Sequence, residues 1–297
     1  MSDKVTIVDV SPWEGFQNSK TYTPFDKKIQ YINMLTEAGI KKIVATSFAH
    51  PKVFPQFIDA EEIMRHFGED RAVTYIAATP NEIGCRRALN AGANEVLFWI
   101  STSETHNMRM LNSTVADTLK ENQLICKICK ENKVKVRSII STAFGCAHEG
   151  KIPISKLMSI ALSLNTLGCY EICLADTHGL ANPRLVKETI STMRKEIPLR
   201  KIGGHFHDLR GMSMANIFAA FEEGIKIFDA AIGGRGCAPD IQSKTIESQM
   251  SQLVYMFEEM GVSTGINIEK IYECEEFVGN ILGIKQSSSK LASWKTP

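Results

Sequence analysis

The sequence predicts an α/β protein built on a closed (β/α)8 TIM barrel with additional helices at its C-terminus. Three observations predict this fold. Short apolar segments with many β-branched residues occur eight times, and stretches with helical periodicity separate them. The strands read as nearly continuous apolar runs, which is typical of a parallel sheet covered by helices. Eight such units within 297 residues favour a barrel over an open sheet.

The expected elements alternate along the whole chain. Strands are predicted at residues 5–10, 42–48, 73–79, 95–101, 134–141, 170–176, 201–207 and 227–234. Helical periodicity is clearest at residues 24–39, 80–92, 117–132, 156–168, 183–196 and 214–224. Several of these stretches end in glycine, which tolerates the left-handed conformation that often follows a helix. The turn after the first strand, SPWEGFQ, is not the glycine-rich turn of an open dinucleotide-binding sheet.

We expect residues 1–297 to form one catalytic domain. Residues 249–285 read as helices that close or cap the barrel, and residues 286–297 read as a mobile tail. The N-terminus has no apolar segment of signal-peptide length, and no stretch of about 18 uninterrupted apolar residues occurs. We therefore predict a soluble, cytoplasmic protein without a membrane partner.

Charge and cysteine content narrow the classes of partner. The 34 basic and 33 acidic residues nearly cancel, and no basic run is present, so nucleic acid is not an expected partner. The eight cysteines are spread through apolar strands and helices, which indicates reduced thiols rather than a disulfide framework. Cys126 and Cys129 form a CxxC pair within a helical pattern, without a second pair at zinc spacing. We interpret them as ordinary helix residues.

The end of the seventh expected strand carries the strongest chemical signal. In a TIM barrel the active site forms where the strands end, and polar residues there outweigh the same residues elsewhere. His205 and His207 are separated by one residue, so both rings point to the same face of a strand and can converge on one ion. Neutral imidazole suits a divalent metal, and Glu14 after the first strand offers a carboxylate. The two histidines could equally be buried or surface groups without a metal.

Other polar residues lie at strand ends or in glycine-rich loops. Asp176 ends the sixth strand and is a candidate for a hydrogen-bonding role in the site, or for a helix cap. Ser47 and Ser141 end the second and fifth strands. Cys237 lies in the loop GGRGCAPD close to Arg235, whose charge favours a thiolate suited to acid–base catalysis. It could also be an inert loop cysteine.

In kind and in order, these motifs resemble those of the 3-hydroxy-3-methylglutaryl-CoA lyase family of metal-dependent barrels. The resemblance runs nearly end to end and is carried by VDVSPWEGFQN, TSFAHPKVFPQ, ATPNEIG, STAFGCAHEGKI, GCYEICLADTHG, GHFHD, GGRGCAP and LVYMFEEMGVSTGIN. It implies a retro-Claisen cleavage in which a divalent ion holds the oxygens of the substrate, a base removes a hydroxyl proton, and an acetyl-CoA enolate is protonated.

Carried over by position, the resemblance assigns roles to individual residues. It implies metal binding by Glu14, His205 and His207, and catalytic roles for Cys237, Asp176 and His205. Trp13, Gln17, Ser47, Ser141 and Arg235 are the candidates for substrate binding. The expected cofactor is Mg²⁺ or Mn²⁺, with Zn²⁺ or Co²⁺ as alternatives. The expected partner is an acyl-CoA or hydroxy-acid substrate, and the expected assembly is a homodimer.

The chain departs from the family at three points in the site. Trp13 stands where the family has an arginine that holds an enolate or thioester oxygen, and an indole donates only one neutral hydrogen bond. The second strand lacks the family's glutamate. After Cys237 no asparagine is present to act as a metal ligand, so Glu247 or Asp240 could replace it.

These departures leave three functions open. The first is a metal-dependent carbon–carbon lyase that cleaves a 3-hydroxy-3-methylglutaryl-CoA-like thioester by retro-Claisen or retro-aldol chemistry. The second is a condensing enzyme that joins an acyl-CoA and an oxo acid. The third is a barrel that has lost catalysis and serves as a binding or scaffold subunit. The retained Glu14, His205, His207, Asp176 and Cys237 weigh against the third, because a dead site has no physical reason to keep them.

Overall fold

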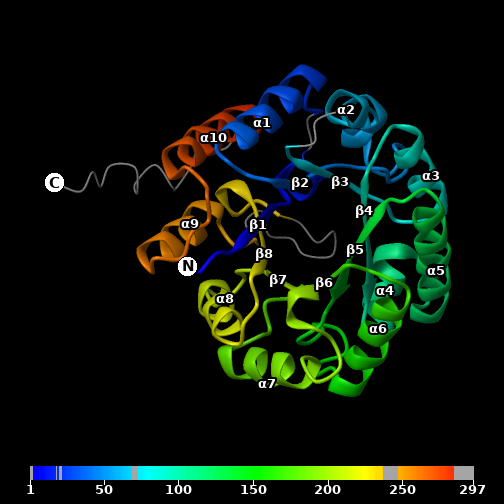
Figure 1. Ribbon diagram of the computed structural model, residues 1–297. Coiled ribbons are helices and arrows are strands. Elements are labelled where there is room, and N and C mark those ends of the chain that lie inside the picture. Colours follow the sequence, from blue (N-terminus) through cyan, green and yellow to red (C-terminus); the bar gives the residue numbers. More distant parts are fainter. Residues whose placement is uncertain (1–2, 18, 20–21, 69–71, 237–246, 284–297) are drawn as a thin grey trace.

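The computed structural model shows a closed barrel of parallel strands surrounded by helices, which confirms the predicted fold (Figure 1). It describes residues 3–17, 19, 22–68, 72–236 and 247–283. The strands are β1 (Thr6–Asp9), β2 (Lys42–Ser47), β3 (Thr74–Ala78), β4 (Glu95–Ser101), β5 (Lys135–Ser141), β6 (Glu171–Asp176), β7 (Ile202–Phe206) and β8 (Ile227–Ala230). They lie in the order of the sequence, and β8 pairs with β1 to close the barrel.

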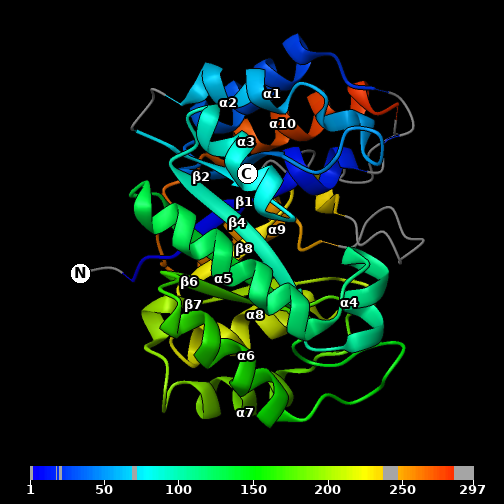
Figure 2. The ribbon, with the colours of Figure 1, turned by 90° about the vertical axis from the view of Figure 1, so that its right-hand side faces the viewer.

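The helices form the outer layer of the molecule. They are α1 (Phe25–Glu37), α2 (Ala60–Phe67), α3 (Glu82–Asn90), α4 (Glu104–Leu111), α5 (Val115–Glu131), α6 (Ile154–Thr166), α7 (Pro183–Met193), α8 (Ser213–Glu222), α9 (Met250–Glu259) and α10 (Ile268–Ile281). Figure 2 shows α4 at one end of the barrel, beyond the end of β4. The predicted C-terminal helices are present as α9 and α10. The predicted tail at residues 286–297 lies outside the described residues.

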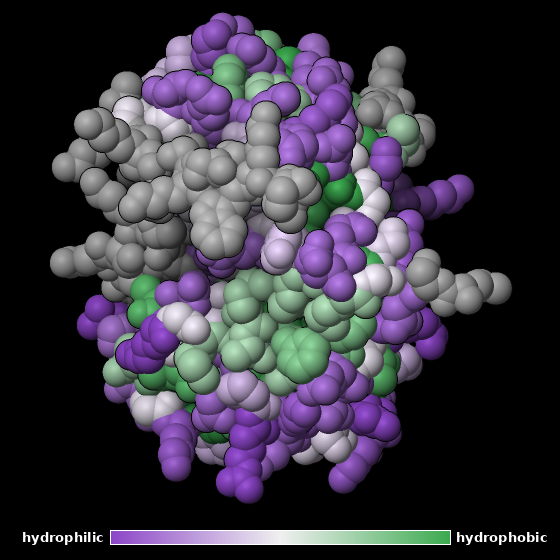
Figure 3. Space-filling view, turned by 90° about the vertical axis from the view of Figure 1, so that its left-hand side faces the viewer, coloured by the Kyte–Doolittle hydropathy of each residue, from purple (hydrophilic) through white to green (hydrophobic). Residues whose placement is uncertain are grey.

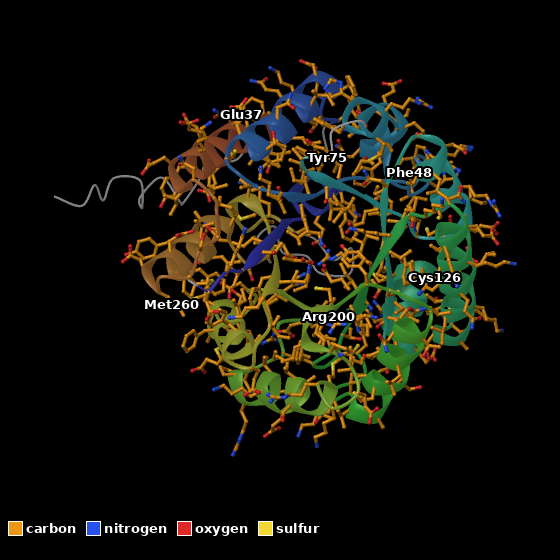
Figure 4. All side chains as sticks on the ribbon, in the orientation of Figure 1. Glu37, Phe48, Tyr75, Cys126, Arg200 and Met260 are labelled. Atoms are coloured by element: carbon orange, nitrogen blue, oxygen red, sulfur yellow. The ribbon has the colours of Figure 1, made fainter. Side chains whose placement is uncertain are left out.

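The core lies between the barrel and its ring of helices. Phe48 after β2 and Tyr75 in β3 are buried inside the ring, whereas Glu37 and Met260 lie exposed on its outer rim (Figure 4). Side chains alternate between the two faces of a strand, so each strand sends every second residue into the barrel. On β8, Phe228 packs against Phe257 of α9, whereas Asp229 contacts Arg137 inside the barrel.

The interior of the barrel holds a buried network of charges. Arg137 of β5 is fully buried and forms ion pairs with Glu171 of β6 and Asp229 of β8. Lys42 of β2 adds an ion pair of 2.8 Å to Glu171. The network fixes polar side chains of several strands in one arrangement beneath the carboxyl ends of the strands. No helix in the described part of the chain is long and apolar enough to cross a bilayer.

Candidate metal centre and active site

The turn after β1 places Glu14 and Trp13 at the carboxyl end of the barrel. Residues Ser11–Gly15 form one turn of π-helix with proline near its start, where the missing N–H is not needed. The amide of Val10 donates to the carbonyl of Ala230, 3.1 Å away, and ties the start of this turn to β8. Glu14 is 6% exposed, so its carboxylate is buried in the interior of the protein.

Both histidines at the end of β7 present the same ring nitrogen to the centre of the site. His205 Nδ1 lies 3.0 Å from Oδ2 of Asp229, and His207 Nδ1 lies 2.7 Å from the carbonyl oxygen of Thr177. Because a carbonyl and a carboxylate only accept, each Nδ1 carries the proton in these contacts. The two Nε2 atoms are 3.0 Å apart and face the same point, where a neutral ring would present a lone pair to a cation.

Glu247 completes the group from a segment that follows β8. The segment pairs with His207 by an antiparallel bridge, and Glu247 is 2% exposed. Its Oε1 lies 2.6 Å from His207 Nε2 and 3.0 Å from His205 Nε2. Gly236 is required beside it, because a Cβ at that position would lie 2.0 Å from Cγ of Glu247. The sequence left the replacement for the family's asparagine open between Glu247 and Asp240, and in the structure Glu247 belongs to the cluster.

The arrangement of Glu14, His205, His207 and Glu247 fits a divalent cation. One ligand atom from each lies within 4.8 Å of all the others, and all four residues are buried. Both carboxylate oxygens of Glu247 are buried without a hydrogen bond of normal geometry, since the nearby Nε2 atoms offer lone pairs rather than protons. Oxygen and nitrogen lone pairs that converge in a dry site require positive charge between them.

The pKa values of His205 and Glu247 are also shifted in the direction that favours positive charge between the carboxylates. Burial opposes a charge on His205, but Glu247, Glu14 and the hydrogen bond with Asp229 outweigh it and raise the pKa of His205 well above its usual value. Burial also opposes the charge on Glu247, but the two histidines hold the pKa of Glu247 well below its usual range. The site thus favours ionised carboxylates and positive charge among them.

Asp229 connects this site to the charged network inside the barrel. Its Oδ2 accepts from His205, while its Oδ1 accepts from the guanidinium of Arg137. A carboxylate on the outer nitrogen of a ligating histidine fixes the tautomer and the orientation of the ring. The sequence analysis missed Asp229 and Arg137. Charged residues inside strands that are otherwise apolar were the available signal, because such charges must be paired to be buried.

A cavity of about 690 Å³ lies beside Glu14, His205 and His207. Trp13, Gln17 and Ser141, predicted to bind substrate, line it together with Glu14, His205 and His207. Nε1 of Trp13 donates to Oε1 of Gln17 at 3.0 Å, and the Trp13 ring packs against Trp99 of β4 with centroids 5.3 Å apart. Trp99 is a further cavity residue that the sequence analysis did not single out.

The remaining predicted site residues lie elsewhere. The carboxylate of Asp176 accepts from the amides of Leu180 and Ala181, so it caps the turn after β6, and burial raises its pKa. Ser47 accepts from the amide of Ala49 at 3.2 Å. Arg235 packs against Gly15, and burial lowers the pKa of its guanidinium. Neither Ser47, Arg235 nor Asp176 is among the described residues that line the cavity, and Cys237 and Asp240 lie outside the described residues.

Comparison with known proteins identifies the family. The family model described as HMGL-like matches residues 4–278. The chain belongs to the HMGL-like family. Human mitochondrial hydroxymethylglutaryl-CoA lyase is 34% identical over 97% of this chain and 89% of its own length. The hydroxymethylglutaryl-CoA lyase of Bacillus subtilis is 33% identical over 99% of this chain and 98% of its own length.

Solved structures agree with this membership. The crystal structure of the Bacillus subtilis lyase superposes with a TM-score of 0.94 at 33% identity and covers 99% of both chains. An HMG-CoA lyase from Acinetobacter baumannii, solved in complex with coenzyme A and 3-methylmalate, gives a TM-score of 0.93 at 33% identity and covers 100% of this chain and 97% of its own. The predicted family and barrel are therefore both confirmed. Of the three functions that the sequence left open, the carbon–carbon lyase is the one that these similarities favour.

Proposed function

We propose that this HMGL-like protein is a divalent-metal-dependent lyase that cleaves a carbon–carbon bond in a 3-hydroxy-3-methylglutaryl-CoA-like hydroxyacyl thioester. The observation that carries the proposal is the convergence of Glu14, His205, His207 and Glu247, three of which also line a cavity. The relatives named as hydroxymethylglutaryl-CoA lyases support the reaction. The neighbour that holds coenzyme A and 3-methylmalate supports a thioester and a chelating hydroxy acid as the substrate class.

The metal in this proposal is Mn²⁺ or Mg²⁺, held by the four clustered residues. A bound cation would supply Lewis acidity, which stabilises the charge that develops on the substrate's oxygens. Two carboxylates and two imidazoles also accept Zn²⁺ or Co²⁺, so metal analysis of the purified protein decides between these ions. Asp229 and the Thr177 carbonyl accept from Nδ1 of His205 and His207, so Nε2 of each ring would face a bound cation.

The chain's own residues then divide the work of binding and proton transfer. Gln17 and Ser141 face the cavity and can donate hydrogen bonds to the oxygens of the substrate. Asp229 and the cation would occupy both nitrogens of His205, and Asp176 does not line the cavity, so we assign the hydroxyl proton to solvent water and protonation of the enolate carbon to Cys237. The bond between the carbinol carbon and the carbon next to the thioester breaks, its electron pair enters the enolate, and the proton replaces it there.

Product analysis tests this function directly. The Mn²⁺-loaded protein is incubated with a panel of 3-hydroxy-3-carboxymethyl acyl-CoA thioesters, and acetyl-CoA and free CoA are followed. We expect acetyl-CoA from at least one thioester, and none when the metal is removed or when His207→Ala is used. A second panel of acyl-CoA and oxo-acid pairs tests the synthetic direction. Absence of acetyl-CoA from every thioester would contradict the proposed cleavage.

Cys237→Ser separates proton donation from metal binding. We expect this variant to retain its metal but to lose turnover, because a hydroxyl is a much weaker acid than a thiol at neutral pH. Unchanged turnover would remove Cys237 from the mechanism.

We further propose that the protein is a cytoplasmic homodimer. Phe218 of α8 and Met260 of α9 are large exposed apolar residues. Both helices lie on the side of the molecule that Figure 3 turns to the viewer, where apolar residues gather near the middle. Light scattering on the purified protein gives the mass of the assembly, and fractionation of the native cells gives its location. A monomeric mass at all concentrations would overturn the first statement, and recovery with the membranes would overturn the second.

A further inference from the structure

Apolar side chains share the cavity with Glu14 and the two histidines of the metal cluster. The apolar residues in its lining include Trp13, Ala49, Val53, Phe54, Ile83, Trp99, Met110, Leu111 and Ile139, and charged residues such as Glu82, Arg109, Asp117 and Glu121 line it as well. Apolar surface in a cavity gains little from a small polar molecule, but it gains from a ligand that covers it.

Two tryptophans are among these apolar residues. Trp13 is 6% exposed and lines the cavity together with Glu14, His205 and His207. Its only polar atom is already used, since Nε1 donates to Gln17. Contact with Trp99, at a centroid distance of 5.3 Å and an interplanar angle of 34°, further fixes the ring. The pair is a rigid surface for an apolar or aromatic group and lacks a charge for a carboxylate.

Two other apolar residues of the lining are open to solvent. Val53 is 67% exposed and Ile83 is 71% exposed, and both line the cavity. Exposed apolar side chains are common singly, but these two belong to the same cavity as Trp13 and Trp99. The two indoles alone present more apolar surface than a single methyl group can cover.

We propose that the substrate carries, on the carbon that bears its hydroxyl, an apolar substituent larger than methyl, either a branched alkyl chain or an aromatic ring. This substituent lies against Trp13 and Trp99 while the hydroxyl and a neighbouring carboxylate reach the metal. The proposal rests on the proposed lyase function and names its substrate class more narrowly. Trp13 is then the residue that determines specificity at the metal-bound carbon.

Binding of small hydroxy acids without coenzyme A isolates this contact. We choose 2-methylmalate and 2-benzylmalate, which share the chelating hydroxyl and carboxylates and differ only in the substituent. Titration calorimetry on the Mn²⁺-loaded full-length protein measures both dissociation constants. We expect 2-benzylmalate to bind at least about tenfold more tightly, since one apolar group in a fitted pocket changes affinity by 10- to 200-fold.

Variants at Trp13 assign the preference to the indole. Trp13→Ala is expected to bring the ratio of the two dissociation constants close to one with unchanged manganese content, and Trp13→Phe is expected to keep most of the preference. Tyr255→Ala is the matched control, because this aromatic side chain is 60% exposed on α9 and does not line the cavity. We expect the control to keep the wild-type ratio.

The outcomes separate this inference from the proposed function. Equal, metal-dependent binding of both malates by the wild-type protein would overturn the inference and leave the lyase proposal standing. The same conclusion follows if Trp13→Ala weakens both malates equally, because that result indicates a structural role. Failure of both malates to bind the manganese-loaded protein would contradict substrate chelation and overturn both proposals.

Discussion

The amino end and the carboxyl end of the barrel interior both hold buried carboxylates, but in the part of the chain that the structure describes these carboxylates are paired with cationic side chains only at the amino end. Toward the amino end of the strands, Arg137 and Lys42 lie among carboxylates and pair with them, and the hydroxyl of Tyr170 donates to Glu95. At the carboxyl end, carboxylates and imidazole nitrogens converge without a guanidinium or ammonium group among the described residues. The first group pairs its carboxylates with cations of the chain, whereas the second is the group for which we propose a metal ion.

Asp229 belongs to both groups and shows why they are coupled. One of its oxygens contacts Arg137 and the other contacts His205. Burial raises the pKa of Asp229, but Arg137 and His205 outweigh burial and leave it lowered. An ionised Asp229 keeps the proton on Nδ1 of His205. The charged network at the amino end of the barrel therefore fixes the orientation of a histidine in the cluster at the carboxyl end.

Removal of both histidines breaks the carboxyl end and is expected to have the largest effect. His205→Ala with His207→Ala leaves two carboxylates, which cannot hold the ion in the same geometry, so metal retention and any C–C cleavage should be abolished. Elemental analysis after gel filtration and acetyl-CoA release measure the two losses. Metal content equal to that of the wild type would refute the assignment of the metal site.

Removal of Arg137 disrupts the buried ion pairs at the amino end of the barrel strands and leaves the metal cluster's ligands in place. Arg137→Met leaves Glu171 and Asp229 buried with fewer opposite charges, and we expect a loss of about 3–5 kcal/mol in the free energy of unfolding. Urea denaturation measures it. Arg184→Ala is the control, because its ion pair with Glu188 is exposed and should contribute less than about 1 kcal/mol. Equal effects of the two substitutions would show that the buried network is not stabilising.

Asp229→Asn tests the connection between the two ends. An amide can accept from His205 but lacks the charge that secures its tautomer, so we expect metal affinity to fall about 10- to 100-fold. Titration with Co²⁺, followed by its visible absorption, reports both affinity and ligand geometry. A change in stability with an unchanged Co²⁺ dissociation constant would limit Asp229 to a structural role.

Asp9 differs from both groups of carboxylates. Among the described residues it has no cationic partner, and it does not belong to the metal cluster. It contacts Ser11, and burial raises its pKa to about 7. The folded protein thus keeps a proton that the unfolded chain releases above its ordinary pKa of 3.8. Stability due to this group should be greatest at low pH and fall by up to about 1.4 kcal/mol per unit between pH 4 and 7.

Asp9→Asn removes that dependence. We expect a flatter curve of unfolding free energy against pH across the same window, measured by urea denaturation at several pH values. A variant with the same slope as the wild type would show that Asp9 is ionised in the folded protein.

Much of the site could be predicted because its signals are local. Strand ends, the spacing of His205 and His207, and the turn that carries Glu14 are all readable within a few residues. Asp176 and Arg235 show the limit of such signals, since both lie close to strand ends but neither is among the described residues that line the cavity. Closeness to a strand end does not fix the face to which a side chain points.

The sequence by itself determined the barrel, because eight apolar strands alternating with amphipathic helices can bury their surfaces in few other ways. It also determined the two histidines and Glu14. Only the tertiary structure selected Glu247 as the fourth member and brought Asp229, Arg137 and Glu171 together from three strands. These residues are far apart in the chain, and closure of the barrel alone sets the distances at which their charges interact.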